Sequence, residues 1–146
     1  MIDQSNGGFL IGKVKQIQGR VFEKLLAEYG IDQFNGAQGR ILFVLWDGDG
    51  IPIRELSDKT GLAKTTLTGM LDRMEAADMV ARAPDKRNRR QILVSITDRA
   101  RGYQRDYDRV SELMNAQFYK GFSEAEVVSF EETLKRIIHN FEETGV

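Results

Sequence analysis

The chain has 146 residues, of which 41% are hydrophobic and 29% are charged, and its formal net charge at pH 7 is −1. This length suits one domain with a buried core, or a compact body with a dimerising extension. The sequence has no cysteine, which excludes disulfides, thiolate zinc sites and thiol-based redox sensing. Its single histidine, His139, argues against a multi-histidine metal site and a Ser-His-Asp triad. We therefore expect no metal and no cofactor.

Nothing in the sequence predicts contact with a membrane. The longest apolar run, residues 41–46, is far shorter than the roughly 20 residues that span a bilayer. Residues 1–8 lack the basic and apolar regions of a signal peptide. We therefore expect a soluble, cytoplasmic protein.

Two helices are predicted in the first third of the chain. Apolar residues recur at intervals of three and four over residues 9–29, which predicts an amphipathic helix. Asn35 and Gln38 form a capping-box-like start for a second helix that runs to Trp46. This second helix is apolar on nearly all sides, so we expect it to be buried. Residues 47–50 are predicted to form a turn.

A helix-turn-helix follows. Residues 53–60 are predicted to be helical, with Pro52 near the start and Gly61 just past the end. Residues 63–77 form the next predicted helix, and the tight turn between the two contains Gly61. One side of the second helix is apolar, and it carries Leu67, Met70, Leu71 and Met74.

The next segment changes to a strand-like period and becomes strongly basic. Residues 79–82 and 92–96 are predicted strands, joined by a polar tip at residues 84–90. Residues 82–105 contain eight basic and two acidic side chains, a net charge of +6. A basic hairpin after a helix-turn-helix predicts a winged helix-turn-helix that binds double-stranded DNA.

Two helices are predicted to end the chain. Thr97 caps one long helix that reaches Phe118, and Ser123 with Glu126 forms a capping box for a last helix that reaches Phe141. The predicted fold is mainly α (α+β), with the order α-α-α-α-β-β-α-α and a short extended piece as an option at Ile51.

Residues 53–102 resemble the winged-helix core of the MarR family of bacterial transcription regulators. The similarity lies in Leu56–Leu62 for the first helix of the motif, Lys64–Glu75 for the recognition helix, and the tip Asp85-Lys86-Arg87 followed by Val94–Thr97 for the wing. The resemblance implies one protomer over residues 1–146, with a DNA-binding part at 35–97 and helical dimerisation parts at 1–34 and 98–146.

The resemblance implies two groups of DNA contacts. On the recognition helix, the threonines face the major groove, where short polar side chains reach base edges; the residues are Lys64, Thr65, Thr66, Thr68, Gly69 and Arg73. On the wing, Arg87 enters the minor groove, Asp85 orients it, and the contacting residues are Asp85, Lys86, Arg87, Arg89 and Arg90. Arg73 is implied to contact phosphate or to brace the wing.

Three residues depart from the family pattern. Gly69 stands where an arginine or another polar residue is common, and Ala63 replaces an N-capping serine. Asp78 replaces a helix-ending glycine, which is tolerable because aspartate adopts the left-handed conformation more readily than most residues. The wing is intact, so we expect DNA binding to survive.

The resemblance also implies a homodimer and an effector. The end helices carry a large apolar surface, which favours an interface over packing within one chain; the expected dimer residues are Leu10, Val14, Ile17, Phe118, Phe130, Ile137 and Phe141. A small aromatic or anionic effector is an option, and the residues of its candidate cleft are Arg20, Phe43, Trp46, Tyr103 and Tyr107. The alternative is that these aromatic residues belong to the core, which is the commoner role of aromatic residues at helical spacing.

The leading hypothesis is a sequence-specific repressor that binds a pseudo-palindromic operator as a homodimer. The alternative is a winged-helix adaptor that binds proteins and has lost DNA binding. Gly69 and Ala63 favour the adaptor, and the +6 segment argues against it. An enzyme is not expected, because no convergent set of acidic and basic side chains emerges.

Overall fold

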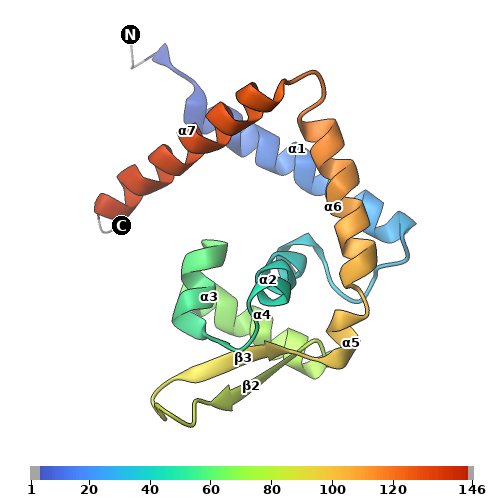
Figure 1. Ribbon diagram of the computed structural model, residues 1–146, viewed down its shortest axis with the longest axis vertical. Helices are drawn as coiled ribbons and strands as arrows, with labels where there is room; N and C mark the ends of the chain where they lie inside the picture. Colours follow the sequence, from blue (N-terminus) through green and yellow to red (C-terminus); the bar gives the residue numbers. More distant parts are fainter. Residues whose placement is uncertain (1–3, 145–146) are drawn as a thin grey trace. The chain divides into compact units, whose positions relative to one another are not determined.

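The computed structural model describes residues 4–144, which form two compact units, one ending at Glu112 and the other beginning at Leu113. The first unit holds most of the elements of Figure 1. In chain order they are α1 (Gly7–Glu28), α2 (Gly36–Asp47), β1 (Ile51–Pro52), α3 (Ile53–Thr60), α4 (Lys64–Ala76), β2 (Val80–Pro84), β3 (Ile92–Ile96), α5 (Asp98–Arg101) and the first part of α6 (Gln104–Phe118). The second unit holds the end of α6 and α7 (Glu124–Glu143).

The helix starts follow local capping. Asn35 and Gln38 exchange side chain-to-backbone hydrogen bonds at the start of α2, and Ser123 and Glu126 do the same at the start of α7. Both capping boxes were predicted, and both are confirmed. Thr97 also caps a helix as predicted, since its hydroxyl accepts a hydrogen bond from the N–H of Ala100.

The single long helix predicted after Thr97 is wrong, because the structure has α5 and α6 in its place. The N–H of Gly102 is shared between the carbonyls of Asp98 and Arg99, and the N–H of Tyr103 bonds to the carbonyl of Ala100 three residues back, which tightens the turn and ends α5. The α-helical pattern then restarts where the N–H of Tyr107 donates to the carbonyl of Tyr103.

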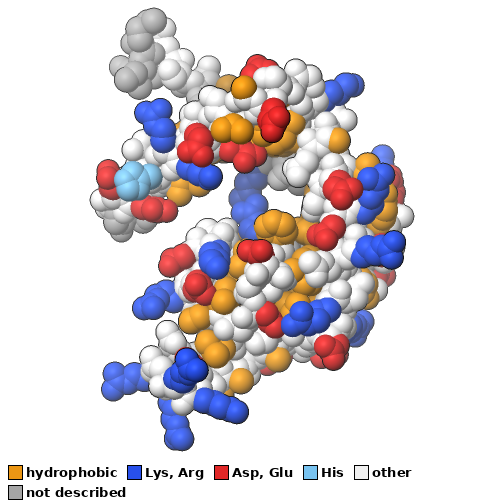
Figure 2. All heavy atoms as spheres, in the orientation of Figure 1, with side chains coloured by type: hydrophobic (Ala, Val, Ile, Leu, Met, Phe, Trp, Pro, Cys, Tyr) orange, Lys and Arg blue, Asp and Glu red, His pale blue; other side chains and the backbone are white. Residues whose placement is uncertain are grey.

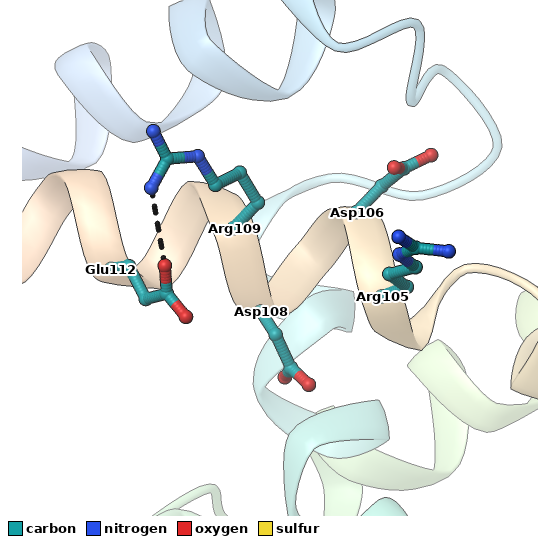
Figure 3. A pocket seen from close by; sticks show the side chains of 5 residues that line it. All are labelled: Arg105, Asp106, Asp108, Arg109 and Glu112. Atoms are coloured by element: carbon teal, nitrogen blue, oxygen red, sulfur yellow. Dashed lines mark hydrogen bonds and ion pairs between the residues drawn. The ribbon is translucent and has the colours of Figure 1, made fainter.

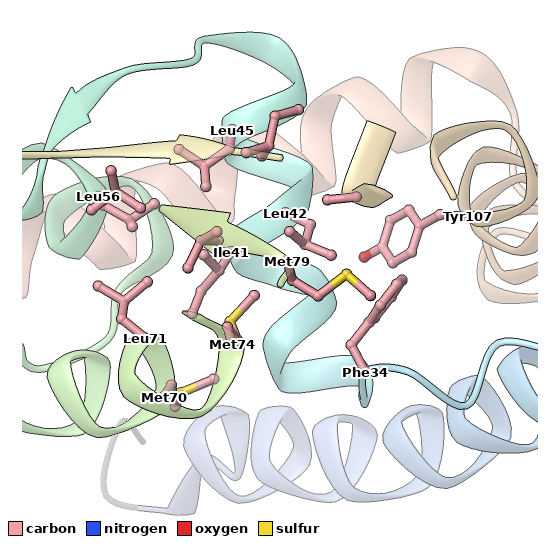
Figure 4. Close-up of a cluster of buried hydrophobic side chains, with 14 of the residues drawn as sticks. Phe34, Ile41, Leu42, Leu45, Leu56, Met70, Leu71, Met74, Met79 and Tyr107 are labelled. Carbon is pink, nitrogen blue, oxygen red and sulfur yellow. The ribbon is translucent and has the colours of Figure 1, made fainter. Parts of the chain in front are cut away.

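The extended piece at Ile51 is a strand in a three-stranded antiparallel sheet of order β1-β3-β2. Ile51 pairs with Val94 in β3, and Val80 in β2 pairs with Ile96. Helices α2, α3 and α4 contact this sheet. The core lies between these helices and the sheet (Figure 4), and its fully buried side chains include Ile41, Leu42, Leu45, Leu56, Leu67, Leu71, Met74, Val80 and Val94.

Burial of this core fixes which side of each helix faces outward. The stripe predicted on α4, made of Leu67, Met70, Leu71 and Met74, is buried as expected. The polar side of α4 is therefore left on the surface beside the hairpin. Among the described helices, none has the length and apolar character that crossing a bilayer requires.

Candidate nucleic-acid interface

The turn between α3 and α4 is held by its own side chains. Gly61 adopts a left-handed conformation with φ of 77°, where glycine avoids the cost that a Cβ would bring. The hydroxyl of Ser57 donates to the carbonyl of Leu62 at 2.6 Å. The buried hydroxyl of Thr60 donates to the carbonyl of Leu56 and accepts from the N–H of Leu62. These bonds fix the direction in which α4 leaves the turn, and sequence reasoning did not assign them.

The outer side of α4 exposes Lys64, Thr65, Thr66 and Thr68. The side chain of Ala63 gives no cap at the start of this helix, as its methyl group dictates. The hydroxyl of Thr68 donates its hydrogen to the carbonyl of Lys64 at 2.9 Å. The hydroxyl hydrogen of Thr68 is therefore engaged, and this residue offers an outside partner its acceptor oxygen and its methyl group. Thr65 and Thr66 form no such bond to a backbone carbonyl among the described residues.

The tip of the hairpin is a compact turn with a basic surface. Backbone hydrogen bonds link the N–H of Asp85 to the carbonyl of Gln91 and the N–H of Gln91 to the carbonyl of Asn88. Figure 2 shows Lys and Arg side chains gathered at this end of the hairpin, and the exposed ones are Lys86, Arg87, Arg89 and Arg90. The sequence thus places four cations on a turn that backbone hydrogen bonds close.

Asp85 acts on the backbone of Arg87. Its carboxylate accepts a hydrogen bond from the N–H of Arg87 at 2.9 Å. The charge-assisted bond implied by the resemblance is therefore present, and it sets the course of the chain at Arg87. The guanidinium of Arg87 forms no ion pair within residues 4–144, so its charge is left for a partner.

Arg82 joins the hairpin to α4. Its guanidinium contacts Asp72 at 2.6 Å and Glu75 at 2.8 Å, and its backbone N–H donates to Glu75 at 3.2 Å. The hydrogen bonds from Arg82 hold the pKa of Glu75 below its usual value, and the same carboxylates raise the pKa of Arg82. A brace between the hairpin and α4 is therefore present, and Arg82 supplies it; the phosphate contact or brace implied for Arg73 stays a prediction.

A third carboxylate, that of Asp49, binds β3, the other strand of the hairpin. Asp49, in the turn after α2, accepts a hydrogen bond from the backbone N–H of Ile96 at 2.8 Å. Its other oxygen pairs with the guanidinium of Arg101 at 2.8 Å. Asp49 was predicted to lie in a turn and was given no role; its position between Gly48 and Gly50 is the signal that the sequence offers.

Tyr107 is the centre of the predicted aromatic cleft. Its ring centroid lies 5.0 Å from that of Trp46 and 6.5 Å from that of Phe43. Phe22 and Phe34, which were not predicted, complete the contacts of this ring. Burial raises the pKa of Tyr107 to about 12. The ring is thus part of the core, as the alternative interpretation held.

The other predicted cleft residues differ in their surroundings. Tyr103 packs against Phe34 with ring centroids 5.8 Å apart. Arg20 is exposed on α1 and forms none of the aromatic contacts of the cluster. The indole N–H of Trp46 is buried and has no hydrogen-bond partner among the described residues. An unpaired buried N–H costs free energy, so it is the one feature here that suits a ligand with an acceptor atom.

A separate hollow of about 410 Å³ lies along α6 and is lined by charged side chains rather than by the aromatic cluster. Arg109 pairs with Glu112 at 3.2 Å inside it. Figure 3 shows that Asp108 and Arg109 point to different sides of α6, so the charges do not converge on one point. Its lining residues are Arg105, Asp106, Asp108, Arg109 and Glu112.

Each unit carries an apolar helix side that its own unit leaves exposed. On α1 this side includes Leu10, Val14 and Ile17. On α7, where no residue is buried, it includes the predicted interface residues Phe130, Ile137 and Phe141. Phe118, at the end of α6, is also exposed and lies 6.2 Å from Phe130 between ring centroids.

Comparisons with known proteins agree with this architecture. Residues 34–92 match the sequence model of the MarR family. The HTH-type transcriptional regulator TtmR of Methylorubrum extorquens is 36% identical over 84 residues, which are 58% of this chain and 42% of that protein. The chain therefore aligns with less than half the length of this relative.

Two solved structures extend the likeness to most of the chain. A mutant MarR from E. coli, complexed with operator DNA, has a TM-score of 0.77 at 26% identity, and the match covers 89% of this chain and 91% of that one. Bordetella bronchiseptica BpsR, whose DNA binding is regulated by 6-hydroxynicotinic acid, has a TM-score of 0.78 at 22% identity with the same coverage. The winged-helix part of this chain, residues 34–92, thus matches the MarR family model, and these two structures share its fold over most of the chain.

Proposed function

We propose that this protein is a transcription regulator that binds double-stranded DNA in a sequence-specific manner. The observation that carries the proposal is the exposed polar side of α4, which lies next to a hairpin with four exposed cations at its tip. Arg82 links the two through Asp72 and Glu75. Operator DNA bound to the 26% identical MarR of E. coli supports the same assignment.

The two parts of the surface have different tasks in this proposal. The short side chains of Thr65, Thr66 and Thr68 reach base edges when α4 enters the major groove. Arg87, Arg89 and Arg90 hold phosphates or the minor groove, which adds affinity with little dependence on sequence. The wing therefore contributes affinity for DNA, and α4 contributes sequence specificity.

The proposal includes a homodimer that acts as a repressor by blocking a promoter. Residues 35–97 form the DNA-binding part, and residues 1–34 and 98–146 form the dimerisation part. The exposed apolar sides of α1 and α7 support this division, because apolar surface of that extent usually marks an interface. A two-fold dimer places two copies of α4 about 34 Å apart, one turn of DNA, and so suits a pseudo-palindromic operator.

An effector site is a second candidate function, favoured by the unpaired indole N–H of Trp46. Phe43 contacts the same Tyr107 ring as Trp46 and has 56% of its surface exposed, so an aromatic ring can stack on it. A small aromatic anion has an acceptor atom that can bind the indole N–H of Trp46, and it has a ring that can stack on Phe43. We expect such a compound to release the wild-type protein from DNA, and we expect Trp46→Phe to abolish this response.

Selection of bound sequences from random duplex DNA tests the main proposal. The wild type should select a pseudo-palindromic sequence. Thr66→Ala should then weaken binding to it by ~1–3 kcal/mol and leave an unrelated duplex nearly untouched. The double variant Arg89→Ala/Arg90→Ala is the matched contrast and should weaken both by similar factors. Selection of no sequence, with binding that does not depend on salt, would favour the protein-binding adaptor.

A further inference from the structure

Arg73 is an exposed cation in the middle of the polar side of α4. Gly69 stands one turn before it. Beyond the adjacent residues and the backbone of α4 itself, a Cβ on Gly69 would meet one atom of the described residues within 4 Å, Nη1 of Arg73 at 3.9 Å. The guanidinium therefore leans back along the helix toward its N-terminus and lies over the space that Gly69 leaves free, as long side chains on helices do.

The acidic residues nearest to Arg73 are already paired. Asp72 and Glu75 both bind Arg82, at 2.6 and 2.8 Å. Arg73 itself forms no ion pair within the part of the chain that the structure describes. Its five N–H donors thus lie on the polar side of α4 and have no hydrogen-bond partner among residues 4–144.

We propose that Arg73 reads a guanine in the major groove, with Gly69 as the gap that lets its guanidinium reach the base. This inference rests on the proposed DNA-binding function. The guanidinium fork matches the N7 and O6 acceptors of guanine, which is the pairing that a lysine cannot reproduce in bidentate form. A glycine in a helix interior costs up to ~1 kcal/mol relative to alanine, and no close contact among the described residues requires it here.

A phosphate contact is the competing role for Arg73, and it makes different predictions. A phosphate contact depends on charge, so Arg73→Lys retains it. A bidentate contact to guanine depends on the fork, so Arg73→Lys loses it while the net charge and the salt dependence stay the same. Two variants at Gly69 provide the matched pair. Alanine meets Arg73 at an ordinary contact distance and leaves the guanidinium in place, whereas leucine fills the gap and displaces it.

The experiment measures binding of the full chain to its selected operator, to operators with one base pair replaced, and to an unrelated duplex over a range of salt. For Arg73→Lys, we expect the preference for one G·C pair in each half-site to fall roughly 5- to 150-fold, with the unrelated duplex bound as before. Gly69→Leu should lose the preference at the same base pair, and Gly69→Ala should keep it.

Two results would overturn the inference while leaving the proposed function intact. One is an Arg73→Lys variant that keeps every base preference, which assigns Arg73 to phosphate. The other is a Gly69→Leu variant whose loss falls on a different base pair from that of Arg73→Lys. A wild type that selects no sequence at all refutes the proposed function and this inference together.

Discussion

Gly39 in α2 and Gly69 in α4 allow one substitution to be compared in two environments. A Cβ on Gly39 would lie 2.7 Å from Cε2 of Tyr107 and 3.4 Å from Cε2 of Phe34. On Gly69 the same atom would meet only Arg73, at 3.9 Å. Both substitutions to alanine favour the helix by up to ~1 kcal/mol. The difference between the two variants therefore measures how tightly α2 packs against Tyr107 of α6.

The contact at Gly39 is too short for real atoms, so Tyr107 or the backbone must move. Tyr107 is only 6% exposed and is held by the rings of Trp46 and Phe22. Forcing an extra methyl group into such a core costs about 1–3 kcal/mol. We expect Gly69→Ala to stabilise the protein by about 1 kcal/mol. Gly39→Ala should be neutral or destabilise it by up to ~2 kcal/mol.

Urea unfolding of both variants at one protein concentration measures this difference, because the stability of the proposed dimer would depend on concentration. Repeating Gly39→Ala in a Tyr107→Leu background removes the ring atom that causes the clash, and the penalty should largely disappear there. Equal stabilisation at Gly39 and Gly69 would refute the reasoning, since it would mean that the ring moves away without cost.

Three further predictions concern the DNA surface, the interface and pH. Arg87→Ala should reduce the magnitude of the salt slope of DNA binding by about one, and an unchanged slope in a salt titration would remove Arg87 from the DNA contacts. Ile137→Asp should give monomers or insoluble protein in sedimentation, because a buried unpaired charge is costly, whereas a monomeric wild type would contradict the dimer. Arg82 lowers the pKa of Glu75 from 4.5, so the stabilisation by this pair is present above that pH and is lost as the pH falls through the lowered pKa. Acid unfolding should show this loss in the wild type and not in Glu75→Gln.

Features that depend on residues close in sequence could be predicted. The starts of α2 and α7 follow from Asn35 with Gln38 and Ser123 with Glu126, because a capping box needs only four residues. The outer side of α4 follows from the periodicity of its apolar residues. The break before α6 was missed although Gly102 lies there, because the apolar residues beyond it continue a helical spacing.

Contacts between elements could not be predicted from local patterns. Arg82 lies ten residues after Asp72, and Arg101 lies 52 residues after Asp49. Charged residues are common on the surface, so no spacing distinguishes these pairs from unpaired ones. The aromatic neighbours of Tyr107 were predicted only in part, because two of them come from other elements far away in the sequence. Phe22 reaches its ring from α1, and Phe34 from the loop before α2.

The ion pairs of Arg82 with Asp72 and Glu75, and of Arg101 with Asp49, explain how a small hairpin keeps a fixed direction. Half-exposed ion pairs contribute little to the free energy of unfolding, typically less than ~1 kcal/mol each. Arg82 nevertheless uses both its guanidinium and its backbone N–H on Glu75, and Asp49 binds the backbone of β3 as well as Arg101. β2 is thus tied to α4 by a backbone bond and by side-chain bonds of Arg82, and β3 is tied by a backbone bond to Asp49, which Arg101 of α5 holds in turn. Such pairs restrict orientation more than they add stability, and the proposed contact of the wing with DNA beside α4 requires that restriction.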